Sequence, residues 1–446
     1  MNHGLVKRKK RLYASLALAA AAGLAWGMFS PAAAAGILSR HRKADTADPP
    51  QKQAPSASQP PAFSIPVEPL GFYSPGPYYM GQREALVSLD FLDENRLLFT
   101  FRAPGLMRRS SVEDSQREIR AEVIALPQGS IETEALWTLH DHDRYLWVLH
   151  SGHFLLRDDN TIKEGDSKLE LRPLLEFPGP LLSIEMDPGQ HYLVTNSFEP
   201  SNVKAQQGQV ASPATAEADV HMDHEGETEK KDTVLRILDR ASGQVMLVSR
   251  VRAPVRVPIN SDGYVETLSG PSPNKNWVLS FDSFKGGSKV LGNVDSSCQP
   301  PVAFAAQDAV VINACVFGNG RRLIAMSTGG HKLWESPSSA TQIWPILVMA
   351  PNGSLVARET LTVDHSIEDF GHSLAQQDIK GQLVEVFDAR GGKLLLRANA
   401  NPVLDGGGNV AISPSGKRVA ILNSGAIEVY EMADRPVPSE PGSQKR

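Results

Sequence analysis

Two histidine-rich segments contain the residues best suited to chemistry. In the first, His140 and His142 stand two positions apart, and His150 and His153 follow shortly after. Residues two apart on a strand point to the same face of the sheet, so the first pair would present two imidazoles together. Imidazole binds divalent metals and titrates near neutral pH. The segment is therefore a candidate metal site or pH-dependent contact, and the plainer alternative is a polar hairpin with histidines at its strand ends.

The second segment lies in a polar, acidic stretch from residue 201 to 232 and contains His221, Asp223 and His224. Imidazoles and carboxylates together could bind a divalent metal. A metal site also needs surrounding groups that hold its ligands in place, and a flexible loop supplies none. We therefore expect a disordered acidic loop here, inserted between two strands, with these three residues as weak metal candidates.

Paired carboxylates are the other arrangement that could do chemistry, because glycosidases place two acids across the scissile bond. The candidates are Asp90, Glu185, Asp282 and Asp364, and no two of them stand out as a pair. The chain lacks the G-x-S-x-G nucleophile elbow, the phosphate-binding GxxxxGKS/T loop, the dinucleotide-binding G-x-G-x-x-G motif and the C-x-x-C-H haem site. These absences argue against an enzyme, and no cofactor is expected.

The only cysteines are Cys298 and Cys315, and they stand 17 positions apart. In an exported protein, two cysteines at this spacing predict a disulfide. The spacing suits two neighbouring strands joined by a hairpin. The alternative is a pair of buried free thiols.

The N-terminus has the pattern of a secretory signal peptide. Five basic residues at 7–11 precede an apolar stretch at 12–29 and small residues that end at Ala35. This order predicts export and cleavage after residue 35, which places the mature chain in the periplasm or outside the cell with no membrane span. An uncleaved membrane anchor is the alternative. Residues 36–84 are rich in proline and predict a disordered linker, and residues 434–446 predict a disordered tail.

The elements that must position any site are short hairpins that recur along residues 85–433. Residues 349–356 and 412–419 each consist of a strand end, a Pro-containing turn closed by glycine, and a second apolar strand. A second phrase, strand–Asp–turn–Gly–strand, recurs at 237–245 and 386–394. The first apolar residues after the turns often stand about 45 positions apart, the length of one four-stranded propeller blade. We place these residues at Leu97, Tyr145, Tyr192, Trp277, Leu323, Leu355 and Val419.

These phrases resemble the degenerate repeats of bacterial WD-repeat-like and YVTN-type β-propellers, including secreted propellers of unknown function. The resemblance covers residues 85–433 and implies an all-β propeller of about seven blades, with six or eight also allowed. It implies export and no particular activity.

The sequence therefore favours a binding module in the cell envelope. Its 446 residues carry a net charge of −5, with 21% charged residues, and this gives no basis for nucleic-acid binding. We expect a monomer that binds an envelope protein or a small ligand. The alternatives are a hydrolase or lyase that uses carboxylates or histidines at the propeller channel, and a structural envelope protein.

Overall fold

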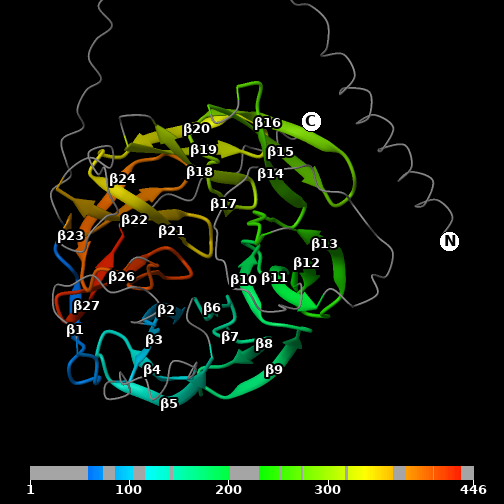
Figure 1. Cartoon of the computed structure of the whole chain (residues 1–446). Helices are drawn as coiled ribbons and strands as arrows, with labels where there is room; N and C mark the ends of the chain where they lie inside the picture. Colours follow the sequence, from blue (N-terminus) through cyan, green and yellow to red (C-terminus); the bar gives the residue numbers. More distant parts are fainter. Residues whose placement is uncertain are drawn as a thin grey trace, which may run out of the picture. The chain divides into compact units, whose positions relative to one another are not determined.

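The chain folds into a ring of seven antiparallel sheets (Figure 1). The computed structural model describes residues 59–73, 86–103, 116–140, 144–200, 231–251, 253–272, 275–316, 320–364, 378–404 and 406–432. Within these ranges every regular element is a strand. The protein is thus a seven-bladed β-propeller, as the repeated hairpins predicted.

The blades are numbered in chain order, and the first strand of each lies innermost. Blade 1 contains β2 (Ser88–Asp93), β3 (Arg96–Arg102), β4 (Arg117–Ala125) and β5 (Ile131–Leu139). Blade 2 contains β6 (Leu146–Val148), β7 (Phe154–Asp158), β8 (Thr161–Gly165) and β9 (Leu171–Glu176). Blade 3 contains β10 (Leu181–Met186), β11 (Tyr192–Pro200), β12 (Lys231–Asp239) and β13 (Val245–Val251). Blade 4 contains β14 (Gly263–Ser269), β15 (Asn276–Ser283) and β16 (Ser288–Asp295).

The last three blades complete the ring. Blade 5 contains β17 (Val302–Ala306), β18 (Ala309–Val316), β19 (Gly320–Ser327) and β20 (Lys332–Pro337). Blade 6 contains β21 (Gln342–Met349), β22 (Leu355–Val363), β23 (Ile379–Asp388) and β24 (Leu394–Ala400). Blade 7 contains β25 (Val410–Ile412), β26 (Arg418–Asn423), β27 (Ala426–Glu431) and, from the other end of the chain, β1 (Phe63–Pro66).

Strand β1 closes the ring and corrects part of the expected linker. It pairs antiparallel with β27, and the blue β1 lies beside the red β27 in Figure 1. The alternation of Phe63, Ile65 and Val67 with exposed residues explains the strand, because Ile65 and Val67 are buried between blades 7 and 1. A proline-rich composition hid this period-2 pattern. Residues 36–58 and 74–84 of that linker lie outside the described residues.

Blade 4 has an irregular inner position. Residues 255–259 occupy it without forming a regular strand, although Ile259 bridges Tyr264 and the Val265 N–H donates to the Pro258 carbonyl at 2.9 Å. Pro254 and Pro258 have no backbone N–H, so this segment cannot form a full ladder of hydrogen bonds.

The core consists of apolar layers between successive blades. Each of the seven junctions has its own cluster of buried side chains. Trp137, Trp147 and Trp334 pack in these layers, and Trp277 is also buried. Trp344 is the exception, with 44% of its surface exposed.

The predicted turns are confirmed, but part of the predicted register is wrong. The Gly353 N–H donates to the Ala350 carbonyl at 2.8 Å, and Gly353 has φ +70°, a conformation that glycine adopts without strain. Tyr145 precedes an inner strand, whereas Trp277 and Leu323 lie on third strands. Hairpins within one blade resemble one another. The turn pattern therefore indicates the number of blades, but it does not show which two strands of a blade each turn joins.

The expected acidic loop joins β11 to β12. Because β12 already begins at Lys231, the loop ends before that residue rather than at 232. Residues 201–230 lie outside the described residues, as do the proposed signal segment 1–35 and all of the 434–446 tail. Among the described residues, no helix is long and apolar enough to cross a membrane.

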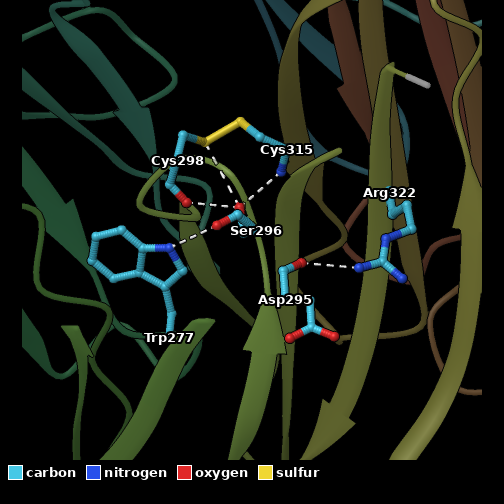
Figure 2. The surroundings of a disulfide bond; sticks show 6 residues. All are labelled: Trp277, Asp295, Ser296, Cys298, Cys315 and Arg322. Atoms are coloured by element: carbon cyan, nitrogen blue, oxygen red, sulfur yellow. Dashed lines mark hydrogen bonds between the residues drawn. A yellow bond between two sulfur atoms is a disulfide. The ribbon is translucent and has the colours of Figure 1, made fainter. Parts of the chain in front are cut away.

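The predicted disulfide between Cys298 and Cys315 is confirmed, with the two Cα atoms 5.6 Å apart (Figure 2). Cys298 lies in the connection from blade 4 to blade 5, and Cys315 lies near the end of β18. Ser296 Oγ donates to the Cys298 carbonyl at 2.7 Å and accepts from the Cys315 N–H at 2.9 Å. The bond therefore fastens an inter-blade connection to a core strand, rather than linking two strands of one hairpin.

Candidate functional site: the central channel

The inner strands surround a cavity of about 390 Å³ on the axis of the propeller. All seven blades contribute to its lining, from Leu86 in blade 1 to Pro414 in blade 7. Its volume lies within the range of small-molecule binding sites. The channel is therefore the candidate functional site.

The ionisable side chains in the channel lining include Tyr145, His150 and Asp187. Four others lie on one side of the channel, one in each of blades 1 to 4. They are Asp90, Arg144, Glu185 and Arg256. Their charges alternate in sign around the ring. The sign changes at every blade, so each group has an oppositely charged neighbour.

Asp90 and Arg144 form the first half of this charged set. Ser88 Oγ donates to Asp90 Oδ2 at 2.7 Å. Burial raises the pKa of Asp90 to about 6, and the nearby Arg144 and this hydrogen bond partly oppose that rise. Arg144 Nε donates to the Leu146 carbonyl at 3.2 Å, and its guanidinium lies over Trp147, with Cζ 5.4 Å from the ring centre. The Trp147 ring and the Leu146 carbonyl thus hold the guanidinium at the channel wall.

Glu185 and Arg256 form the second half. Arg256 Nε lies 3.7 Å from Glu185 Oε1, and 84% of the Arg256 side chain is exposed. Burial raises the pKa of Glu185, while Arg256 and the Val257 backbone N–H favour its charged form. The surrounding blades lower the pKa of Arg144 by desolvation, and Arg256 lowers it further, although Asp90 opposes this. Two guanidinium groups thus lie close enough to repel each other.

The opposite side of the channel is apolar. Ala303 on β17 and both Ile346 and Val348 on β21 line it. Gly406 and Gly408 continue this wall in blade 7. A ligand in the channel would therefore meet charged groups on one side and an apolar surface on the other.

A polar cluster marks one end of the channel, which we call the hairpin end because the turns 149–153, 187–191 and 350–354 meet there. The His150 N–H donates to Gln190 Oε1 at 2.6 Å. The His150 side chain also hydrogen-bonds to the backbone of Pro351, which links blade 2 to blade 6. Burial lowers the pKa of His150. These contacts join blades 2, 3 and 6 at the hairpin end.

The structure separates the first histidine group of the sequence. His140 precedes β6, where its Nδ1 lies 2.9 Å from Asp158 Oδ1, whereas His150 and His153 follow β6 at the hairpin end. No group of three or more His, Cys, Asp or Glu residues could hold a metal in the part of the chain that the structure describes. His142 lies outside that part.

The second histidine group, His221, Asp223 and His224, also lies outside the described residues. Its metal-binding hypothesis therefore stays a prediction.

Two of the four carboxylate candidates reach the channel, namely Asp90 and Glu185. Asp282 lies on β15, a third strand, and Asp364 forms an ion pair with Lys380 at 2.7 Å. Sequence reasoning missed Arg144 and Arg256. Arg144 lies just before the inner strand β6, and Arg256 lies in the irregular inner segment of blade 4. The sequence did not locate either of these inner segments.

No known protein family matches the chain, and no curated protein matches it. Among solved structures, it resembles Pyrococcus horikoshii acylaminoacyl peptidase, with 11% identity over 79% of this chain and 52% of the peptidase and a TM-score of 0.47. Raptor from Chaetomium thermophilum gives 11% identity, 85% and 29% coverage and a TM-score of 0.44. TolB from Acinetobacter baumannii gives 13% identity, 68% and 70% coverage and a TM-score of 0.33. The chain spans about half the length of the peptidase structures.

Proposed function

We propose that this propeller is an exported binding module whose ligand enters the central channel. The observation that carries the proposal is the charged set Asp90, Arg144, Glu185 and Arg256, which faces an apolar wall inside one cavity. Convergent polar groups in a largely apolar pocket are typical of ligand sites. Asp90 and Glu185 are partly buried, and partial loss of water strengthens their interaction with a charged ligand.

Export to the periplasm or cell exterior is part of the same proposal. It is supported by the basic and apolar N-terminal pattern and is compatible with the disulfide. The monomeric state and an envelope protein as partner stay predictions. The channel favours a small ligand, or the end of a partner chain, over a flat protein surface.

A thermal-shift screen of the full chain tests the proposal, using amino acids, short peptides, sugars and nucleotides as probes. A ligand present at 100 times its Kd should stabilise the protein by about 2.7 kcal/mol. Ala303→Trp would fill the channel without changing its charges and should abolish the shift. Leu333→Trp places the same side chain on the outer strand β20, where Leu333 is exposed. This control variant should keep the thermal shift. A ligand that stabilises both variants equally would bind elsewhere.

A hydrolase is the second candidate, because Asp90 and Glu185 share the channel and burial raises the pKa of both carboxyls. A raised pKa lets a carboxylic acid donate a proton near neutral pH. Turnover of a channel ligand that is lost in both Asp90→Asn and Glu185→Gln would support this candidate. Stable binding of an unchanged ligand supports the binding module.

A further inference from the structure

We propose that the channel takes a compact zwitterion, with a carboxylate and an ammonium group a few bonds apart, as in a short peptide with free ends. This inference rests on the proposed function, because it names the ligand class of the same site. It depends on which atoms of the four charged residues remain available to a ligand.

Arg144 provides the carboxylate half of the site. Its Nε is engaged by the Leu146 carbonyl and its face by Trp147, so the guanidinium plane is held in place. Its two terminal nitrogens donate no hydrogen bond to any residue that the structure describes. A planar guanidinium fork matches a carboxylate with two parallel hydrogen bonds. An anion here would also offset the repulsion between Arg144 and Arg256.

Asp90 provides the ammonium half. Its Oδ2 accepts from Ser88 Oγ at 2.7 Å, whereas Oδ1 has no hydrogen-bond partner among the described residues. Glu185 lies two blades further round the same wall, where it is held loosely by Arg256 at 3.7 Å. An ammonium group beside Asp90 would therefore find a free acceptor in Oδ1.

The balance of charge favours a zwitterion over a simple ion. The Asp187 carboxylate also lines the channel, but it accepts from the Gly189 and Tyr192 backbone N–H groups at 2.9 and 2.7 Å. The remaining two carboxylates and two guanidinium groups would attract a ligand with one charge through one pair and repel it through the other. A zwitterion can align its dipole with the neighbouring pair Asp90 and Arg144. Its apolar part would then lie against Ile346 and Val348 on the opposite wall.

Isothermal titration calorimetry on the full chain tests this inference with three probes: alanyl-leucine with free ends, its N-acetyl form and its C-terminal amide. The free dipeptide should bind, and each blocked form should bind at least ~10-fold more weakly, because blocking either end removes a charge-assisted hydrogen bond to the channel. This comparison needs no variant, so it is independent of any folding defect.

Two variants assign the halves of the site. Arg144→Gln should remove the preference for the free acid over the amide, and Asp90→Asn should remove the preference for the free amine over the acetyl form. Arg172→Gln is the matched control, because the Arg172 side chain on β9 is 80% exposed, and it should change neither preference.

A pH titration gives a third measurement. Lowering the pH from about 7.5 to about 5 protonates Asp90 and should weaken binding of the free dipeptide to the wild type more than to Asp90→Asn. Glu185 and His150 also titrate near the channel. Arg144 and Tyr145 face Asp90, and Arg256 interacts with Arg144 and Glu185. The difference between the two proteins isolates Asp90.

Equal binding of all three probes would overturn the zwitterion while leaving a channel ligand in place. No binding by any probe at about 10 mM would also reject the zwitterion. The thermal-shift screen with Ala303→Trp then decides separately whether the channel binds any ligand at all.

Discussion

The Ser415 backbone N–H donates to Glu94 Oε1 at 2.6 Å, a contact between residues 321 positions apart in the chain. It joins the first hairpin turn of blade 1 to that of blade 7. The Arg418 guanidinium strengthens the same junction by donating to the Glu94 carbonyl at 2.7 Å. The ring is thus closed by polar contacts at its hairpin end and by strand β1 at its outer edge.

Strand β1 should matter for stability although it lies in a proline-rich segment. Ile65→Ala removes a side chain buried between blades 7 and 1 and should cost about 2–5 kcal/mol of unfolding free energy. Ser64→Ala alters an exposed position of the same strand and should leave the unfolding free energy nearly unchanged. Chemical denaturation measures both. Equal stability of the two variants would mean that β1 does not close the ring.

The disulfide should stabilise the protein by limiting the unfolded chain. Closing a loop with a sequence separation of 17 residues contributes about 3 kcal/mol in the chain-entropy model. Cys298→Ala with Cys315→Ala should lower the melting temperature by several degrees. Reductant should lower that of the wild type similarly and leave the double variant unchanged. If reductant leaves the melting temperature of the wild type unchanged, the prediction is contradicted.

Glu359 should make stability depend on pH. It is fully buried on β22, its Oε1 accepts from Gln382 Nε2 at 2.5 Å, and its Oε2 has no hydrogen-bond partner among the described residues. Burial raises its pKa to about 8. The folded state therefore binds a proton that the unfolded state has lost, and stability should fall as the pH rises from about 4.5 to about 8, and then level off.

Glu359→Gln removes that proton equilibrium and keeps the shape of the side chain. The variant should lose much of the decline, because a tenfold difference in proton affinity between the folded and unfolded states is equivalent to about 1.4 kcal/mol of stability. Part of the decline in stability with rising pH should persist in this variant, because burial also raises the pKa of Glu122 to about 7. Denaturation at pH 5 and pH 8 measures it, with the exposed Glu176→Gln as control. Identical slopes in wild type and Glu359→Gln would contradict this assignment.

Trp344 should be a strained residue at the start of an inner strand. It has φ +45° and lies at a β-bulge between Ile343 and Ile346. The left-handed conformation costs a non-glycine residue about 1–2 kcal/mol, and asparagine tolerates it better. Trp344→Asn should therefore raise the free energy of unfolding by about 1 kcal/mol, whereas Trp344→Phe should not. A loss of stability in the asparagine variant would mean that the ring makes contacts that outweigh the strain.

The fold was predictable from the sequence because its elements are local. Turns such as the one closed by Gly353 depend on residues a few positions apart, and each repeated phrase indicates one hairpin. The disulfide was predictable because the chain has only two cysteines, although the bond joins an inter-blade connection to β18 and not two strands of one hairpin. Strand β1 was not, because its partner β27 lies at the other end of the chain and its own composition favours a linker.

Neighbouring residues along the chain are enough to specify the hairpins, their approximate number and the pairing of Cys298 with Cys315. Which charges meet depends instead on how the blades close into a ring. Asp90, Arg144, Glu185 and Arg256 are ordinary polar residues in the chain, and they become a site because four separate blades bring their inner strands to one axis. The pKa shifts of Asp90, Arg144 and Glu185 arise mainly from burial in that channel, and no local pattern encodes burial of this kind.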